Sequence, residues 1–427
     1  MSYQFTDNEY KQGELHIPEG VRDVYADSCR KKIKLQEIIH HLFNLYGFKD
    51  IETPTFEFFD VFSKERGTVP SKELYKFFDR DGNTLVLRPD ITPSIARCFA
   101  KYYKNEELPV RLCYCGNTFI NYHSYRGKLK ETTQLGVELM NDATTDADAE
   151  IIALTIECLL ACGLTEFQVE IGHADFYNGL VEEAGFSEDE ILALRSLMDS
   201  KNIFGVEEMI DEKQISAELK ELMKKLPDLF GTAEILEFAK LRTKNERALA
   251  ALERLEKLYD IIKTYGLEKY VTFDLGLTSQ YQYYTGIIFK GYTYGNGEPV
   301  VSGGRYDALL KQFHKDSPAV GMVIFLDQLQ LTLERQNKLT EDKENIMLLY
   351  HNEFRNIAIK IAGQYRKEES NLELVRKSSR WDLEDYKQHA IKDNVATIFY
   401  MENEKEVRII NLADGIEHTE TVEAMLS

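Results

Sequence analysis

The chain has 427 residues, of which 43% are hydrophobic and 29% charged, with a formal net charge of −20. These proportions are ordinary for a globular protein of about two domains. The net acidity argues against a sequence-independent grip on nucleic-acid backbones, which needs clustered Lys and Arg; by default such acidity serves solubility. The chain shows no basic segment leading into an apolar run at its N-terminus, and no stretch of roughly 18 apolar residues, so a cytoplasmic protein without membrane spans is expected.

Six cysteines are scattered through the sequence without the dense spacing of a disulfide scaffold, which predicts reduced thiols. They are Cys29, Cys98, Cys113, Cys115, Cys158 and Cys162. Cys113 and Cys115 point to the same face of a predicted strand, yet no CxxC pair or nearby pair of histidines completes a tetrahedral set. Buried packing is expected for these two thiols, and neither a metal nor a cofactor is predicted.

The first elements in chain order indicate a helix followed by antiparallel strands. Apolar residues recur at helical spacing from Ser28 to Tyr46, and Gly47 supplies a stop signal. DIETPTFEFFDVF reads as a strand broken at Pro54, and YKFFDRDGNTLVL reads as a hairpin turning at Asp81 and Gly82. RLCYCGNTFINY and TTQLGVELM then predict two longer strands joined by a polar loop.

The middle of the chain changes from strands to helices. Residues 146–162 predict an apolar helix that Gly163 ends, and FQVEIG predicts a strand. From about 177 to 265 the sequence is rich in Glu, Lys, Leu and Ala at helical spacing, with LFGTAEILEFAKL and NERALAALERLEKLYDIIKTYG as the clearest examples. We interpret this stretch as an inserted helical region, because no heptad repeat lasts long enough for a coiled coil.

Strand patterns return with VTFDLGL, YQYYTGIIFKGYTY and EPVVSGG, the last two joined by a turn at residues 295–297. A helix is predicted over about 320–335. Polar residues 336–344 indicate a linker, and residues 345–427 alternate strand and helix patterns as a small α/β domain does. The predicted organisation is a domain over 1–335 that contains the insertion, followed by the linker and the domain over 345–427.

Seven segments, taken in order, resemble the histidyl-tRNA synthetase family, and the resemblance runs over nearly the whole chain. They are IPEGVRD, FKDIETPTFE, LVLRPDITPSIAR, TTQLGVE, QYYTGIIF, VVSGGRYDALL and PAVG. The resemblance implies an α+β fold of the class II aminoacyl-tRNA synthetase type: an antiparallel six-stranded sheet flanked by helices, with a C-terminal domain similar to a degenerate anticodon-binding module. It also implies a homodimer interface built by the first family motif, here around residues 48–59.

The same resemblance implies that the amino-acid half of a synthetase site is retained. Histidine needs acceptors for its ammonium, hydrogen-bond partners for its imidazole, and aromatic walls. Asp90 and Thr92 match the residues that receive the ammonium, and Gln134 and Glu138 match the Gln and Glu beside the bound amino acid. The tyrosines around its side chain are matched by Tyr283, Tyr284 and Tyr306. Asp90 stands where the family has Glu, which shortens its reach by one methylene.

The nucleotide half, by contrast, has lost the family's cations. Ile120 and Tyr122 replace the Arg and Glu of the second motif, and Ser279 replaces the Arg that acts on the reacting carboxylate and phosphate. In the third motif Phe325 replaces the Gly that admits adenine, and Gln328 replaces the Arg that clamps the γ-phosphate. Each missing Arg removes about 3 kcal/mol of transition-state stabilisation. The resemblance therefore predicts that adenylation is absent.

Without the family pattern, these residues have simpler readings. Tyr, Gln and Thr on strands are usually packing residues, Asp90 is a common helix N-cap, and GGRYD is a typical strand-ending turn. The alternative explanation for a single lost Arg is compensation by a nearby cation such as Arg126, Lys128 or Lys130. A coordinated loss in three separate segments makes this explanation poor.

A fold that keeps histidine recognition and loses ATP chemistry resembles the regulatory subunits of short-form ATP phosphoribosyltransferase. That resemblance implies a catalytic partner, HisG, in a hetero-octamer of four subunits of each kind, with histidine as an allosteric feedback inhibitor and no catalysis by this chain. Many members end soon after the third motif, whereas this chain continues, and the mixed charge of its tail predicts no tRNA binding. The alternatives are a divergent histidyl-tRNA synthetase and another histidine-binding paralogue with a different partner.

Overall fold

The computed structural model describes residues 15–63, 69–122, 128–277, 283–339 and 345–427. The chain divides into two compact units, one made of Met1–Asp23 and Lys31–Lys338 and the other of Val24–Arg30 and Leu339–Ser427. Across these described ranges, no helix combines the length and the apolar character that crossing a bilayer requires.

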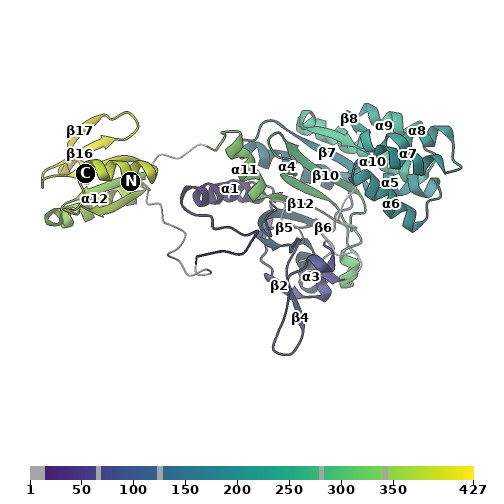
Figure 1. The fold of residues 1–427 in the computed structure, drawn as a ribbon, viewed down its shortest axis with the longest axis horizontal. Coiled ribbons are helices and arrows are strands. Elements are labelled where there is room, and N and C mark those ends of the chain that lie inside the picture. The colour runs from purple at the N-terminus through teal and green to yellow at the C-terminus, as the bar shows by residue number, and fades with distance from the viewer. Residues whose placement is uncertain (1–14, 64–68, 123–127, 278–282, 340–344) are drawn as a thin grey trace. The chain divides into compact units, whose positions relative to one another are not determined.

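The larger unit is built on a nine-stranded sheet whose six middle strands run antiparallel (Figure 1). In sheet order these six are β5 (Val110–Phe119), β6 (Glu131–Met140), β12 (Ala319–Phe325), β11 (Val301–Arg305), β10 (Ile287–Thr293) and β7 (Phe167–His173). The parallel strand β1 (Lys49–Asp50) extends one edge. β9 (Val271–Asp274) and β8 (Phe230–Gly231) extend the other edge. The predicted six-stranded antiparallel sheet is thus confirmed as the middle of a larger, mixed sheet.

One predicted helix, over residues 320–335, is wrong in its first half. Residues Ala319–Phe325 form strand β12, and helix α11 (Leu326–Arg335) begins only afterwards. Strand β12 lies between β6 and β11, and most of its residues are buried. Because a strand covered on both faces carries a continuous apolar run, its sequence lacks the alternation that distinguishes a strand from a buried helix.

Four helices pack around the middle of this sheet. They are α1 (Ala26–Leu45), α3 (Thr92–Tyr102), α4 (Thr145–Ala161) and α11. Helix α4 begins at Thr144, whose hydroxyl accepts the N–H of Ala147 as an N-cap. It packs against β11 and β12, while α11 packs against β6. Helices α1 and α4 were both predicted within two residues of their observed ends.

A small second sheet projects from the body of this unit (Figure 1). It consists of β2 (Phe56–Phe58), β4 (Thr84–Leu87) and β3 (Lys76–Phe78), with helix α2 (Asp60–Ser63) beside it. The predicted hairpin is confirmed: the Asp79 carboxylate accepts the backbone N–H groups of Asp81 and Asn83 at 2.9 and 2.8 Å. Gly82 adopts the left-handed conformation, with φ of 82°, which glycine reaches at no steric cost.

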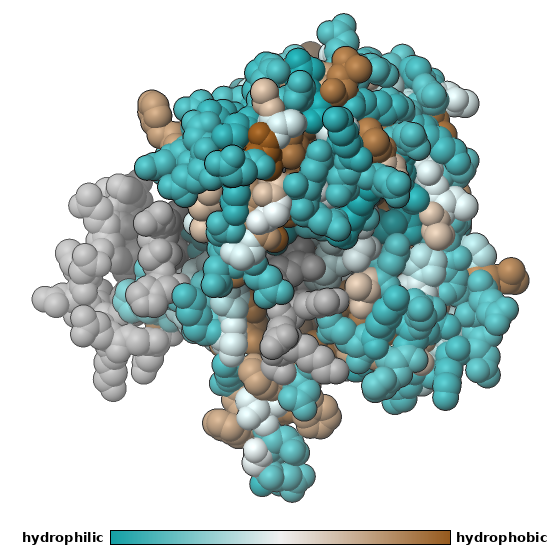
Figure 2. All heavy atoms as spheres, turned by 90° about the vertical axis from the view of Figure 1, so that its right-hand side faces the viewer, coloured by the Kyte–Doolittle hydropathy of each residue, from teal (hydrophilic) through white to brown (hydrophobic). Residues whose placement is uncertain are grey.

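The inserted region is helical, as predicted, apart from one short strand. Its helices are α5 (Ala174–Glu183), α6 (Glu188–Asp199), α7 (Ile203–Asp211), α8 (Ala217–Lys225), α9 (Glu234–Lys240) and α10 (Glu246–Tyr265). LFGTAEILEFAKL was read as one helix, but Phe230–Gly231 form β8, which pairs with β9, so α9 starts only at Glu234. Figure 2 looks onto the side of the larger unit that these helices form, where most side chains are hydrophilic and hydrophobic ones are scattered.

The second unit contains a five-stranded sheet with helices packed on it. The sheet order is β14 (Leu372–Arg376), β13 (Asn345–Tyr350), β15 (Val395–Met401), β16 (Glu406–Asn411) and β17 (Glu417–Thr421). Its helices are α12 (Arg355–Lys367), α13 (Leu383–Lys392) and α14 (Val422–Leu426). The predicted alternation of strand and helix is present, and β17 and α14 are additions that the sequence pattern did not indicate.

All six cysteines are free thiols. Cys113 and Cys115 both lie on β5, but Cys113 is buried and Cys115 is exposed. The expectation of buried packing therefore holds for Cys113 and is wrong for Cys115, because the sheet is covered unevenly along this strand.

Candidate functional site

One cavity in the larger unit brings together the seven side chains that the family resemblance predicts to bind histidine. Four parts of the chain supply them: the start of α3, strand β6, the segment before β10, and the end of β11. The cavity is lined by Asp90, Thr92, Gln134, Glu138, Tyr283, Tyr284 and Tyr306, together with Ser302, Gly321, Met322 and Val323.

Strand geometry explains why Gln134 and Glu138 share this cavity. Residues at i and i+4 of a strand point to the same face, and both lie on β6, which is buried along most of its length. Gly136 lies between them and leaves room for Tyr114 of the neighbouring strand, because a side chain added at Gly136 would meet the Tyr114 hydroxyl at 2.4 Å.

The Glu138 carboxyl is held by two hydroxyl groups. The Thr92 hydroxyl donates to Glu138 Oε1 at 2.7 Å, and the Tyr306 hydroxyl donates a short hydrogen bond to Oε2. Glu138 is only 1% exposed, and this burial raises its pKa to about 8 despite both hydrogen bonds, which act in the opposite direction. The carboxyl is therefore mostly protonated at neutral pH.

Asp90 is the second buried carboxyl of the cavity. Its Oδ1 accepts the backbone N–H of Thr92 at 3.2 Å, and its Oδ2 accepts the Tyr283 hydroxyl at 3.3 Å. Burial raises its pKa to about 6, against the lowering effect of these hydrogen bonds. Burial thus raises the pKa of both neighbouring carboxyls, and that of Glu138 more than that of Asp90.

The cavity is small and has aromatic walls. The Tyr283 ring lies 4.8 Å from that of Tyr284 and 5.8 Å from that of Tyr306, measured between ring centroids. The enclosed space is about 20 Å³, which holds roughly one water molecule. Within the described part of the chain, the buried Gln134 Oε1 has no hydrogen-bond partner. The arrangement is thus a small, partly open pocket rich in acceptors, and the described residues that line it include no Lys or Arg.

Four lining residues were not among the predicted site residues: Ser302, Gly321, Met322 and Val323. Tyr114, whose hydroxyl lies against Gly136 of the same strand as Gln134 and Glu138, was not predicted either. Ser302 and Gly321 lie inside VVSGGRYDALL and PAVG, two segments that carried the family resemblance as wholes. Burial raises the pKa of Tyr114 well above its ordinary value, with the charges of Glu138 and Asp90 as further causes. Only the alternation of β5 hinted that Tyr114 faces inward.

The structure describes four of the five positions at which the chain departs from the pattern of a synthetase's nucleotide site. Phe325, at the end of β12, pairs with Gln134 of β6. Gln328, in the first turn of α11, accepts a hydrogen bond from the Asn296 side chain at 3.1 Å. Ile120 and Tyr122 follow β5, and their backbone amides bond to Lys130 and Ile120 carbonyls. Ser279, the fifth such position, falls outside the described residues.

Several described cations around these positions are already engaged. Arg22 and Lys32 each contact Asp327 Oδ1 at 3.1 Å, while Asp327 Oδ2 accepts the backbone N–H of Thr133. Lys128 lies over the Tyr122 ring and pairs with Glu298 at 3.0 Å. A phosphate entering here would have to compete with these carboxylates for each cation.

The buried polar network that supports the site extends to Asp148. Asp148 is fully buried and bonds to Arg305 and Arg254, and Arg305 directly precedes Tyr306. These contacts join α4, β11 and α10. They fix the end of β11, where the Tyr306 hydroxyl reaches Glu138.

Known proteins with similar sequences belong to the histidyl-tRNA synthetase group. The sequence model of the family described as histidyl-tRNA synthetase matches residues 20–329. The ATP phosphoribosyltransferase regulatory subunit of Acetivibrio thermocellus is 38% identical over 413 residues, covering 96% of this chain and 98% of that one. The corresponding subunit of Ruminiclostridium cellulolyticum is 37% identical and covers 97% of this chain and 98% of its own.

Two solved structures share the fold. A Bacillus halodurans protein described as an ATP phosphoribosyltransferase regulatory subunit/histidyl-tRNA synthetase superposes with a TM-score of 0.81 at 34% identity, covering 91% of this chain and 99% of that one. Histidyl-tRNA synthetase from Nostoc superposes with a TM-score of 0.80 at 19% identity, covering 96% and 98%, which shows the fold alone.

The antiparallel sheet and its acidic, tyrosine-walled pocket define a protein with the fold of a histidyl-type class II synthetase. Within this class, the chain is similar over 96–97% of its length to ATP phosphoribosyltransferase regulatory subunits. The chain belongs to the family of ATP phosphoribosyltransferase regulatory subunits within the histidyl-tRNA synthetase group.

Proposed function

We propose that this chain is a non-catalytic regulatory subunit that binds histidine in the pocket around Glu138 and thereby sets the activity of a catalytic ATP phosphoribosyltransferase subunit. The observation that carries the proposal is the convergence of seven pocket side chains, two of them buried carboxyls, in one cavity. The nucleotide-side positions that the structure describes are apolar or uncharged.

The chemistry of the pocket suits free histidine. The ammonium group of histidine would give Asp90 and Glu138 a positively charged hydrogen-bond partner. Hydrogen bonds between charged groups are stronger than those between neutral groups. The unpartnered Gln134 Oε1 can accept an N–H of the imidazole or the ammonium. The tyrosine rings provide the flat walls that an imidazole needs.

Adenylation requires cations where negative charge accumulates, and the described residues on the nucleotide side offer a poor supply. Phe325 and Ile120 carry no charge, and Lys32 is already paired with Asp327. Restoring a phosphate site would need both new cations and the release of existing ion pairs. This supports a binding role without catalysis.

The small volume of the pocket suggests how binding becomes regulation. A cavity of about 20 Å³ is far too small for an amino acid, so histidine must bind a more open arrangement of these side chains. A ligand that binds one of two arrangements shifts the population towards it. In our proposal this chain in its unliganded form favours the active catalytic subunit, and the histidine-bound form favours the inhibited one.

We place a homodimer interface around residues 48–59, as in the synthetase family. The support is an exposed aromatic surface on the small projecting sheet, because large exposed apolar groups mark interaction sites. Phe56, Phe58 and Phe78 are 52%, 57% and 72% exposed. Two such dimers with four catalytic subunits would give the hetero-octamer that the family resemblance implies, in the cytoplasm and without tRNA.

Co-purification tests the proposed function directly. We expect this chain to co-purify with a short-form catalytic subunit and to raise its ATP phosphoribosyltransferase activity, and we expect histidine to reverse the increase. A purified chain that exchanges pyrophosphate into ATP in the presence of histidine would instead establish a divergent synthetase. No effect on the catalytic subunit would favour a histidine-binding paralogue with another partner.

Gly321 provides a test of the pocket's geometry. A methyl group at Gly321 would lie 1.8 Å from Glu138 Oε2 and 2.6 Å from the Val137 carbonyl oxygen. We expect Gly321→Ala to displace the Glu138 carboxylate and to weaken histidine binding at least tenfold, measured by calorimetry. Gly363→Ala, where nothing lies within 4 Å of the added carbon, is the matched control; equal affinity in both variants would contradict this geometry.

Histidine affinity should fall as the pH is lowered from 8 to 6. The Glu138 carboxyl has a pKa of about 8 in the free protein, and an ammonium beside it favours the ionised form. Binding below pH 8 must therefore release a proton, and the affinity should fall by up to about tenfold per pH unit. Below about pH 6 Asp90 adds a second proton.

Calorimetry in two buffers of different ionisation enthalpy counts the released protons. The imidazole of free histidine also titrates in this range, with a pKa of about 6.5, so Glu138→Gln serves as the reference in which only the ligand's own titration and that of Asp90 remain. An affinity that is flat between pH 7 and 8 would show that Glu138 does not ionise on binding.

A further inference from the structure

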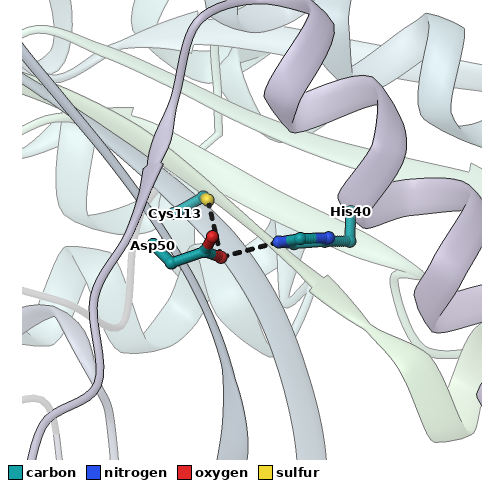
Figure 3. Close-up of side chains that lie close together, drawn as sticks. All are labelled: His40, Asp50 and Cys113. Atoms are coloured by element: carbon teal, nitrogen blue, oxygen red, sulfur yellow. Dashed lines mark hydrogen bonds and ion pairs between the residues drawn. The ribbon is translucent and has the colours of Figure 1, made fainter.

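Three potential metal ligands meet at one edge of the large sheet, away from the pocket. His40 comes from α1, Asp50 from β1 and Cys113 from β5, and the Asp50 carboxylate lies between the other two (Figure 3). Asp50 Oδ1 is 2.6 Å from His40 Nε2 and 3.6 Å from Cys113 Sγ. One ligand atom from each residue lies within 4.8 Å of the others.

The local fold places these groups together. Helix α1 ends near Gly47, whose φ of 78° turns the chain into β1. Strand β1 runs parallel to β5 with Asp50 directly opposite Cys113. The His40 and Asp50 side chains are 45% and 71% exposed, whereas Cys113 is buried, so the cluster opens to solvent on one side only.

We propose that His40, Asp50 and Cys113 bind a Zn²⁺ ion, with its fourth position open to water. Zinc prefers Cys sulfur, His nitrogen and carboxylate oxygen in four-coordinate sites, and mixed sulfur and nitrogen ligands exclude Mg²⁺ and Ca²⁺. This departs from the sequence expectation of no metal, which considered Cys113 only with Cys115 and lacked the register that brings Asp50 and His40 to it.

Two of the three ligand pairs require only a small adjustment, and the third pair, His40 Nε2 and Cys113 Sγ, lies within 4.8 Å and must come to about 3.6 Å. With the usual Zn–S and Zn–O lengths, a tetrahedral site puts sulfur and oxygen about 3.5 Å apart, close to the 3.6 Å observed. His40 Nε2 and Asp50 Oδ1 must separate by roughly 0.7 Å, because tetrahedral nitrogen and oxygen ligands lie about 3.3 Å apart. The high exposure of the Asp50 side chain permits this movement.

Asn44 supplies an outer partner for the histidine. Its side-chain amide lies 3.4 Å from His40 Nδ1, and ligating histidines usually hydrogen-bond through their second ring nitrogen. With the ion bound through Nε2, Nδ1 carries the proton and donates to Asn44 Oδ1 after rotation of the amide. A neutral His40 then only changes tautomer, with its single proton carried on Nδ1 instead of Nε2, while the Cys113 thiol gives up its proton to water as the Zn–S bond forms.

Such an ion would tie helix α1 to the sheet edge. Strand β1 has only two residues, so few ladder hydrogen bonds hold it, and it lies at the start of the proposed dimer segment, residues 48–59. Zinc would stabilise this edge without contacting the histidine pocket, so the inference stands independently of the proposed function.

The test uses the full-length chain, freed of metal with a chelator and titrated with Zn²⁺ and Co²⁺. We expect one tightly bound equivalent, the near-ultraviolet absorption of a cobalt–thiolate bond, and a raised thermal midpoint with Zn²⁺. Cys113→Ser should abolish the thiolate band, and Asp50→Asn, at an exposed position that folding tolerates, should weaken Zn²⁺ binding at least about tenfold.

Two neighbouring residues give matched controls. Cys115 is exposed and lies two residues after Cys113 on the same strand, and His41 is exposed and follows His40 on the same helix. We expect Cys115→Ser and His41→Gln to leave the Zn²⁺ affinity and the cobalt spectrum unchanged. A cobalt complex without a thiolate band would overturn the proposal. So would loss of the band in Cys115→Ser, or equal Zn²⁺ affinity in Asp50→Asn and the unmodified chain, which would leave His40 and Asp50 as a simple hydrogen-bonded pair.

Discussion

Replacing Glu138 with glutamine should weaken histidine binding by about 100-fold or more at pH 8, while the chain still folds and still activates its catalytic partner. Removing a buried charge that pairs with the ligand ammonium costs about 3 kcal/mol, which corresponds to roughly a 100-fold change in affinity. Feedback inhibition in the assembled enzyme should require correspondingly more histidine. Isothermal titration calorimetry and the activity assay measure the two effects separately.

Glutamine is the informative replacement because the free protein hardly distinguishes it from glutamate near neutral pH. The pKa of about 8 keeps Glu138 mostly protonated there, so its neutral isostere can keep hydrogen bonds to Thr92 and Tyr306. Glu138→Ala instead removes the partner of both hydroxyls and leaves a void. We expect that variant to lose about 2–4 kcal/mol of stability as well.

The matched control for Glu138 is Glu131 on the same strand. Glu131 accepts a hydrogen bond from Asn117 at 2.8 Å and does not line the cavity. Glu131→Gln should leave histidine affinity within about twofold of the unmodified chain. Unchanged affinity in Glu138→Gln would instead remove Glu138 from the binding site.

The ionisation of Glu138 should also make the free energy of unfolding depend on pH when no ligand is present. The pKa of Glu138 is raised on folding, so the folded state holds a proton that the unfolded state has lost above about pH 4.5. The stabilising contribution is complete at low pH and falls as the pH rises towards 8. The pH dependence of the urea midpoint should therefore be shallower in Glu138→Gln.

Asp148→Asn should be the most destabilising conservative change in the larger unit, by about 3–5 kcal/mol. Asp148 is fully buried between two guanidinium groups: Oδ1 accepts Arg305 Nε at 2.8 Å, and Oδ2 accepts Arg254 Nε at 2.9 Å. Asparagine would remove the carboxylate that pairs with Arg254 and would leave the buried Arg305 with only Asp307, at 3.3 Å. Because Arg305 precedes Tyr306, loss of histidine affinity should accompany the loss of stability.

Urea unfolding followed by circular dichroism measures this loss. Asp146→Asn, two residues earlier in the same helix and exposed, is the matched control and should cost less than about 1 kcal/mol, the usual scale for a charge near a helix N-terminus. Equal midpoints for the two variants would show that the ion network around Asp148 contributes nothing net.

The sequence by itself determined the elements whose signals are local. Glycine and an acidic turn residue indicated the hairpin at Asp81 and Gly82, and an apolar stripe ended by Gly163 indicated α4, because turn geometry and helix periodicity depend on neighbours in the chain. The family motifs also identified the seven pocket residues, since each lies inside a segment that resembles the synthetase pattern.

Only the tertiary structure decided what depends on partners distant in sequence. Strand β12 was mistaken for helix because a strand buried on both faces has no alternation, and its identity follows from pairing with β6 and β11. The pKa values of Asp90 and Glu138, the placement of Asp148 between Arg254 and Arg305, and the approach of His40 to Cys113 likewise arise from burial and register. Desolvation and distance are properties of the folded chain, and the linear order of residues does not contain them.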